Sequence, residues 1–141
     1  MPLRSPPLLP GRRAWLLAPL GSLALPAQAT NTPLRDAMRR AEALRDEAVR
    51  AGDQPYGAVL LRGERVVGAA PSRVVTHNDP TAHAEMEAIR DAARSLRSRD
   101  LSGCVLVSTS RPCRMCEAAA AWAGISRMVY GEGLTDAGPP R

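Results

Sequence analysis

Two short motifs about thirty residues apart constrain the fold of this chain, because their side chains have to meet at one point. The first is His83-Ala84-Glu85 and the second is Pro112-Cys113-Arg114-Met115-Cys116. One imidazole and two thiolates suit a tetrahedral Zn²⁺ site and leave its fourth position open to water, whereas a closed structural site uses four protein ligands. Glu85 is not needed as a ligand. A carboxylate beside a three-ligand zinc site favours hydrolytic chemistry.

The residues of the two motifs have separate expected roles. His83, Cys113 and Cys116 are the predicted ligands of one Zn²⁺ per chain. Glu85 is the predicted proton shuttle, which takes a proton from the attacking water and later delivers it to the leaving group. Cys113 and Cys116 are three residues apart, so both sulfurs are expected on one face of the first turn of a helix. The free N–H groups at a helix start favour thiolates there.

Two other interpretations of the cysteines stay open. A Cys-x-x-Cys pair can form a redox disulfide, although no thioredoxin-like pattern surrounds Cys113 and Cys116. A structural zinc site could instead recruit His77 or Cys104 as its fourth ligand. Cys104 opens the apolar run Cys104-Val105-Leu106-Val107, which is typical of a buried strand. We therefore expect Cys104 to lie in the core rather than at the metal.

The hydrophobic pattern predicts an α/β fold with the element order α-β-β-α-β-α-β. Such an order fits a three-layer α/β/α arrangement with a mixed sheet of about four strands and helices on its faces. The region from Gly131 onward contains several Gly and Pro residues, and residues 132–141 are predicted to be an unstructured tail. The expected helices are a first one capped by Asn31 or Thr32 and ended by Gly52, a second one from Thr81, and a third one through Cys113 and Cys116 to about Ala123. The expected strands are Tyr56–Leu61, Arg65–Ala70, Cys104–Ser108 and Ile125–Tyr130.

Length and charge narrow the class of protein further. A chain of 141 residues, 45% of them hydrophobic, fits one domain with one core, here assigned to residues 30–131. All 19 basic residues are Arg, and three of them precede residue 30. The remaining 16 face 14 acidic residues, so the body is nearly neutral. Nucleic-acid-binding proteins usually carry a basic stripe, and the charge therefore favours a small-molecule substrate.

Residues 1–29 have the features of an export signal. Arg4, Arg12 and Arg13 precede a modest apolar run, and Ala27-Gln28-Ala29 fits a cleavage site of small residues. The Arg12-Arg13 pair resembles a twin-arginine signal, and the apolar run is too short to span a bilayer. An exported, periplasmic enzyme is expected if the leader is genuine. A Pro-rich leader or a wrongly assigned start codon, with a cytoplasmic protein, is the alternative.

From about residue 36 to residue 131 the chain resembles the cytidine and deoxycytidylate deaminase superfamily, and within it the purine branch of guanine and tRNA adenosine deaminases. The resemblance implies a three-layer α/β/α fold, zinc on the three ligands named above, Glu85 as the proton shuttle, and a homodimer whose subunits complete each other's sites. The stretches that carry the resemblance are Pro55-Tyr56-Gly57-Ala58-Val59, Asn78-Asp79-Pro80-Thr81-Ala82-His83-Ala84-Glu85-Met86, Pro112-Cys113-Arg114-Met115-Cys116 and Val129-Tyr130-Gly131.

Three departures from the family pattern bear on the substrate. Ser72 stands where many relatives have a substrate-contacting Asn, and a hydroxyl replaces the paired donor and acceptor of an amide. Ser72 and Ala84 are the candidate substrate contacts. Arg111 replaces a frequent Glu, as a solvated loop charge or as a group that favours an anionic substrate. Relatives also continue past the fourth strand with another helix, so this chain is expected to be short at its C-terminal end.

The leading functional hypothesis is a zinc-dependent hydrolytic deaminase of an amino-purine base or nucleoside, with guanine first. The alternatives are a tRNA adenosine-to-inosine deaminase and a truncated zinc-binding remnant with little or no activity. A small purine substrate and a homodimer are the expected partners. Nucleic acid and a membrane span are not expected.

Overall fold

The computed structural model describes residues 32–141. The leader assigned to residues 1–29 and the capping residue Asn31 lie outside the described residues. Among the helices that are described, none is long and apolar enough to cross a membrane.

Five strands form one mixed sheet in the order β2-β1-β3-β4-β5. Strand β1 (Gly57–Arg62) lies antiparallel to its neighbours β2 (Arg65–Pro71) and β3 (Cys104–Ser108). Strand β3 runs parallel to β4 (Arg127–Tyr130), and β5 (Thr135–Gly138) pairs antiparallel with β4 at the edge. The predicted hairpin and the predicted strand Cys104–Ser108 are confirmed.

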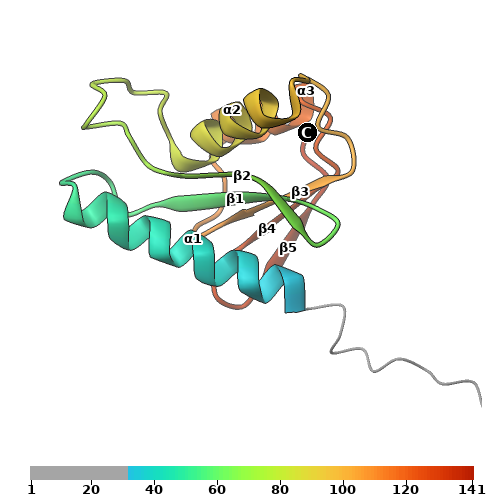
Figure 1. The fold of residues 1–141 in the computed structure, drawn as a ribbon, viewed down its shortest axis with the longest axis horizontal. Helices are drawn as coiled ribbons and strands as arrows, with labels where there is room; N and C mark the ends of the chain where they lie inside the picture. Colours follow the sequence, from blue (N-terminus) through green and yellow to red (C-terminus); the bar gives the residue numbers. More distant parts are fainter. Residues whose placement is uncertain (1–31) are drawn as a thin grey trace, which may run out of the picture.

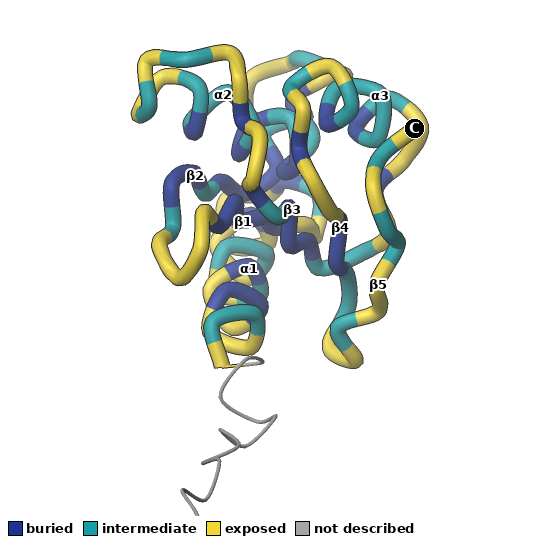
Figure 2. Tube along the Cα trace, turned by 90° about the vertical axis from the view of Figure 1, so that its right-hand side faces the viewer, coloured by how far each residue is buried: buried dark blue, intermediate teal, exposed yellow. Residues whose placement is uncertain are grey.

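Helices cover both faces of the sheet, as Figure 1 shows. Helix α1 (Thr32–Arg50) packs on one face, and α2 (Ala84–Leu96) and α3 (Arg114–Trp122) lie on the other. The predicted three-layer α/β/α fold is confirmed. Buried hydrophobic residues form a cluster on each face of the sheet, and Figure 2 shows the buried residues concentrated around the central strands.

Small residues let the helices lie very close to the sheet. The predicted apolar stripe of α1 faces β1, with Met38 and Ala41 buried. A Cβ atom at Gly57 of β1 would lie 2.0 Å from the carbonyl oxygen of Ala41, so only glycine fits there. On the opposite face, a Cβ at Gly68 of β2 would lie 2.5 Å from the carbonyl oxygen of Ala88 in α2.

The structure corrects the prediction for the C-terminal end. Residues 132–141 were expected to be unstructured, but Thr135–Gly138 forms β5, so the sheet has five strands rather than about four. The turn before β5 places Leu134 at a positive φ of 51° and packs it partly against the α1 side of the core. Gly131 and Gly133 lie in the turn before this short edge strand, Gly138 is its last residue, and two prolines follow it.

The second predicted helix begins later than expected. Thr81 was predicted to start it, but α2 begins at Ala84 with His83 as the extended residue before it. The Asp79 carboxylate accepts hydrogen bonds from both the backbone N–H and the hydroxyl of Thr81, at 2.8 and 2.7 Å. This local turn holds Thr81 in the loop and leaves the first helical position to Ala84.

Candidate metal centre and substrate cavity

His83 reaches the site from the residue immediately before α2. Its backbone is extended, with φ −61° and ψ 152°, and its side chain makes no capping hydrogen bond to the helix. The imidazole is therefore directed by the chain's entry into α2 rather than by the helix itself. His83 and Glu85 are two residues apart and would point in different directions on a regular helix. They converge because His83 lies outside α2 and Glu85 lies in its first turn.

The two cysteines lie at the start of α3, as the sequence predicts, but they occupy different kinds of position. Cys113 is the extended residue before the helix, with φ −73° and ψ 171°, and is exposed. Cys116 lies in the first turn and is fully buried. Their Sγ atoms are 3.6 Å apart, and both cysteines are free.

Three ligand atoms from these residues form a nearly equilateral triangle. The Nδ1 atom of His83 lies 3.7 Å from the Sγ of Cys113 and 3.7 Å from the Sγ of Cys116. Zinc bonds of about 2.3 Å to sulfur and about 2.0 Å to nitrogen at a tetrahedral angle would separate S from S by about 3.8 Å and N from S by about 3.5 Å. The residues present therefore fit a Zn²⁺ ion in both donor type and spacing.

The protonation of Cys116 is consistent with a site that needs a cation. Burial, followed by the nearby Glu85 carboxylate, raises the pKa of the Cys116 thiol far above its ordinary value. The N–H groups at the start of α3 are therefore not enough to stabilise a Cys116 thiolate, because the cost of burying its charge is larger. A metal ion supplies the charge that makes the thiolate favourable.

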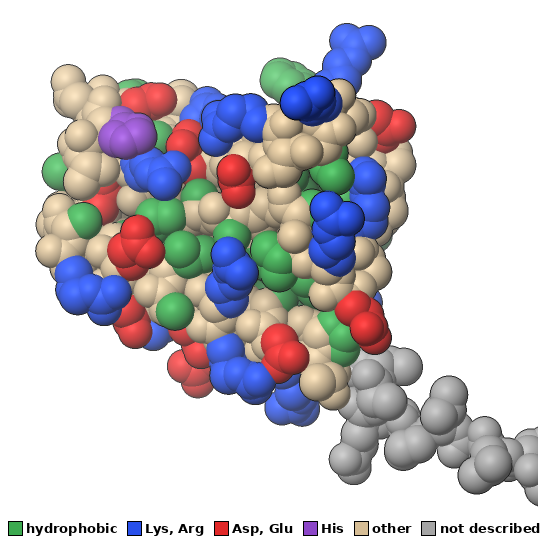
Figure 3. Space-filling model, in the orientation of Figure 1, with side chains coloured by type: hydrophobic (Ala, Val, Ile, Leu, Met, Phe, Trp, Pro, Cys, Tyr) green, Lys and Arg blue, Asp and Glu red, His purple; other side chains and the backbone are tan. Residues whose placement is uncertain are grey.

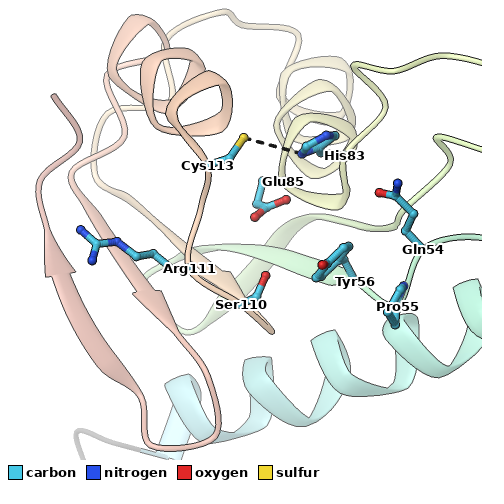
Figure 4. Close-up of a pocket in the computed structure, with 8 residues that line it drawn as sticks. All are labelled: Gln54, Pro55, Tyr56, His83, Glu85, Ser110, Arg111 and Cys113. Carbon is cyan, nitrogen blue, oxygen red and sulfur yellow. Dashed lines mark hydrogen bonds between the residues drawn. The ribbon is translucent and has the colours of Figure 1, made fainter.

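Glu85 lies beside the triangle without belonging to it. Among the described residues, the group of side chains spaced to hold a metal consists of His83, Cys113 and Cys116. Glu85 is 5% exposed, and Figure 4 shows its carboxyl below His83 and Cys113 and above Tyr56 and Ser110. Burial raises its pKa, while its own backbone N–H and the neighbouring His83 act in the opposite direction. A buried carboxyl with a raised pKa holds a proton more readily than an exposed one, as a proton shuttle requires.

A cavity of about 400 Å³ opens on this site, a volume within the range of small-molecule sites. Two of the three ligand residues, His83 and Cys113, form part of its wall, so a cation held by the triangle would be reached from it. The wall residues come from the entry to β1, the start of α2 and the β3–α3 connection (Figure 4). They are Gln54, Pro55, Tyr56, His83, Glu85, Ser110, Arg111 and Cys113.

The candidate substrate contacts Ser72 and Ala84 are both buried and are not among these wall residues. The Ser72 hydroxyl donates a hydrogen bond of 2.9 Å to Asp53. Cys104 is buried in β3, as predicted, and His77 lies in the exposed part of the loop before α2. Neither belongs to the three-ligand group found among the described residues. Arg111 does line the cavity, although its guanidinium points away from Glu85 in Figure 4.

Asp53 organises the loop that borders the cavity, and the sequence alone did not single it out. Its carboxylate accepts hydrogen bonds from the backbone N–H groups of Gln54, Val75 and Thr76, and from the hydroxyls of Ser72 and Thr76, at 2.8 to 3.1 Å. Burial opposes ionisation, but the N–H groups of Thr76 and Gln54 and the two hydroxyls outweigh it and hold the pKa of Asp53 well below its usual range.

A second set of polar contacts fixes the loop against α2. Glu87, in the first turn of α2, pairs with Arg73 at 3.2 Å and with Arg90. The backbone N–H of Arg73 donates to the carbonyl of Ala82 at 2.9 Å, next to the ligand residue His83. The loop that delivers His83 is therefore held at its first residues and at its last.

Comparison with known proteins places this site in a family. The zinc-binding region of cytidine and deoxycytidylate deaminases, as a family model, matches residues 31–132. The guanine deaminase of Bacillus subtilis (strain 168) is 40% identical over 101 residues, which are 71% of this chain and 65% of that protein. The tRNA-specific adenosine deaminase of Buchnera aphidicola subsp. Schizaphis graminum is 38% identical over 85 residues, which are 60% of this chain and 56% of that protein.

A solved structure agrees with these relatives. The X-ray structure of guanine deaminase from Bacillus subtilis superposes with a TM-score of 0.65 at 38% identity, over 68% of this chain and 62% of that one. This chain thus spans less than two thirds of the length of both relatives and of the solved structure. The family match runs from the start of α1 past the end of β4 and includes every residue of the triangle. The chain belongs to the cytidine and deoxycytidylate deaminase family.

Proposed function

We propose that this chain is a zinc-dependent hydrolytic deaminase that converts an amino-purine, guanine first, and water to the oxo-purine and ammonia. The observation that carries the proposal is the triangle of Nδ1 and two Sγ atoms at tetrahedral spacing, with the buried carboxyl of Glu85 beside it at the wall of a small cavity. Three protein ligands leave a position for water, and the spare carboxyl serves to move protons.

In this reaction His83, Cys113 and Cys116 hold the ion, one per chain. When bound, Zn²⁺ supplies the Lewis acidity that lowers the pKa of water in its open position. Glu85 accepts a proton from the attacking water and passes it to the ring nitrogen next to the attacked carbon. It then takes the second proton, from the hydroxyl now bound to that carbon, and passes it to the departing amine as the C=O bond forms and the C–N bond breaks. The amine leaves as ammonia. Burial of Glu85 excludes bulk water, which would otherwise exchange with that proton.

Three observations support a purine of small size. The relative from Bacillus subtilis is named a guanine deaminase. The cavity has the volume of a small-molecule site. Basic and acidic side chains alternate over the face of the molecule in Figure 3, where no continuous basic stripe of the kind that binds nucleic acid is visible.

An activity panel tests the proposal. The metal-loaded full chain is incubated with guanine, guanosine, adenosine and cytidine, and released ammonia is measured together with the zinc content by elemental analysis. We expect one zinc per chain and ammonia from guanine. Replacement of Glu85 by Gln keeps the metal and lowers turnover by at least about a hundredfold, because an amide cannot shuttle the proton. Full activity of Glu85→Gln would show that the role assigned to Glu85 is wrong.

Two alternatives remain as outcomes of the same panel. The likeness to a tRNA-specific adenosine deaminase supports adenosine-to-inosine conversion in tRNA. If inosine formed in an anticodon stem-loop and no free purine released ammonia, the substrate would be tRNA adenosine rather than guanine. One zinc per chain without turnover of either class would instead favour a zinc-binding remnant with little or no activity.

A homodimer and export complete the proposal. Trp122, at the end of α3, is 89% exposed, and so large an exposed apolar side chain is consistent with a second subunit. Sedimentation of the metal-loaded protein as a monomer at all concentrations would contradict the dimer. The features of residues 1–29 support export, which fractionation of cells that express the tagged full chain would test. A protein found with an uncleaved N-terminus in the cytoplasm would contradict it.

A further inference from the structure

Gln54 presents a free carboxamide at the wall of the cavity. Its backbone is fixed, because its N–H donates to Asp53 at 2.8 Å and its carbonyl accepts from the N–H of Tyr56 at 2.8 Å. Its side chain makes no hydrogen bond with any other described residue, and Figure 4 shows the amide end pointing up along the cavity on the His83 side. A held backbone with an unengaged amide is suited to binding a ligand.

Ser72 is not placed to donate a hydrogen bond to a ligand, because its hydroxyl proton is already engaged. The Ser72 side chain is 2% exposed and donates to Asp53, which also holds the backbone of Gln54. Asp53 therefore links the two residues: its carboxylate accepts the hydrogen bond of the Ser72 hydroxyl and holds the backbone of Gln54 in place. The polar group that faces the cavity at this corner is the amide of Gln54.

The chemistry of the other wall residues does not match a purine edge. A lactam, in which a ring N–H adjoins a C=O, presents one donor and one acceptor side by side, and a carboxamide is complementary to it. The guanidinium of Arg111 offers donors without an acceptor, and the hydroxyls of Tyr56 and Ser110 each offer a single atom. The described residues contain two carboxamides, Gln54 and Asn78, and of these Gln54 lines the cavity.

We propose that Gln54 is the specificity-determining residue of the deaminase, and that its carboxamide binds the lactam edge of a 6-oxo-2-aminopurine. The inference rests on the proposed function and names the part of the substrate that the site recognises. The amide NH₂ donates to the C6 oxygen and the amide oxygen accepts from the N1–H. The 2-amino group, on the carbon next to N1, is then directed toward the metal side of the cavity.

A comparison of guanine with 2-aminopurine tests the inference, because 2-aminopurine keeps the reacting amino group and lacks both the C6 oxygen and the N1 proton. Ammonia release gives kcat/KM for each purine with the metal-loaded full chain. We expect the guanine to 2-aminopurine ratio to fall by at least about tenfold in Gln54→Leu, mainly through a higher KM for guanine, since one lost buried hydrogen-bond pair costs that much.

Ser72→Ala is the discriminating variant. It is expected to lower stability through Asp53 while it leaves the guanine to 2-aminopurine ratio unchanged. A collapse of the ratio in Ser72→Ala, with no change in Gln54→Leu, would overturn the inference in favour of Ser72. An unchanged ratio in both variants would also overturn it.

A binding measurement separates this inference from the proposed function. The fluorescence of 2-aminopurine reports its binding to metal-loaded Glu85→Gln, and guanine competes for the same site. Stronger competition by guanine that disappears in Glu85→Gln combined with Gln54→Leu supports the role of Gln54 even if turnover were absent. The inference would be overturned if guanine competed equally well in Glu85→Gln and in Glu85→Gln combined with Gln54→Leu. The proposed function would still stand if the wild type released ammonia from guanine.

Discussion

Asp53 shows how one buried carboxylate can hold two segments that are distant in the sequence. It joins the entry to β1, where Gln54 lines the cavity, to the loop that begins at Ser72 and ends at the ligand His83. Its five donors come from four residues, and all of them stabilise the ionised form. A neutral side chain at this position would leave several of these donors without a partner in a buried place.

Replacement of Asp53 by Ala is expected to lower the free energy of unfolding by about 3 kcal/mol, because hydrogen bonds to a charged group are strong and the orphaned donors remain buried. Denaturant titration measures the change. Asp46→Ala is the matched control: Asp46 is exposed and pairs with Arg45 at the surface, so its loss is expected to cost under about 1 kcal/mol.

The effect of Asp53→Ala on the free energy of unfolding should also depend on pH. The folded-state pKa of Asp53 lies below its unfolded value, so its contribution to stability is present above the unfolded pKa and is lost as the pH falls through the folded pKa. The difference in unfolding free energy between the wild type and Asp53→Ala should therefore be constant from neutral pH to about 5 and shrink in more acidic solution. A difference that stayed constant down to the acid transition would contradict the assignment.

At the level of the elements, one glycine sets the distance between α2 and the sheet. A Cβ at Gly68 of β2 would lie 2.5 and 2.6 Å from backbone atoms of Ala88 and Ala92, which cannot move aside without moving α2. Because α2 carries Glu85 and begins after His83, its position on β2 is part of the site. The packing of one strand residue thus reaches the metal ligands.

Gly68→Ala is expected to destabilise the protein by about 3 kcal/mol through overpacking and to weaken metal binding as α2 shifts. Gly133→Ala is the control, because a Cβ there meets no atom within 4 Å. Thermal unfolding and metal titration of the two variants measure the effects. A Gly68→Ala protein as stable as Gly133→Ala would show that α2 is not held at the distance inferred here.

The elements also show what the sequence can and cannot predict. The period of apolar residues identified α1, the hairpin and the buried strand of Cys104, because these elements bury one regular face. It missed β5, whose four residues are too few to show a period and which exists by pairing with β4. The start of α2 was placed too early, since the turn at Asp79 competes with the helix for Thr81.

Some residues of the site could likewise be predicted from the sequence, and others could not. His83, Cys113, Cys116 and Glu85 could be named from their spacing, because metal chemistry restricts both residue type and separation. Gln54 and Asp53 could not, since their roles depend on the tertiary contact between the entry to β1 and the loop after β2. Ser72 was named as a substrate contact from its position in the pattern, and its burial against Asp53 became visible only in the fold.

For the whole molecule, the metal site acts as a cross-link between two halves of the chain. His83 follows the hairpin and loop, whereas Cys113 and Cys116 follow β3, and the two groups meet at the starts of neighbouring helices. An ion bound there contacts both halves in the folded protein and not in the unfolded chain. Metal binding should therefore appear as stability of the entire domain.

Removal of the metal is expected to lower the unfolding free energy by about 4 kcal/mol when free zinc in the reference sample is about a thousand times its dissociation constant. For a domain of this size the melting temperature should fall by roughly 15 °C, measured by calorimetry before and after chelation. His83→Ala is expected to lose this response, and His77→Ala, which alters a loop residue outside the triangle, is expected to keep it. Because the Cys116 thiol has a raised pKa and must lose its proton when the metal binds, zinc affinity should also rise at least about tenfold per pH unit from pH 6 to 8. Equal melting temperatures with and without chelator, at full zinc occupancy in the reference, would mean that the ion does not join the two halves.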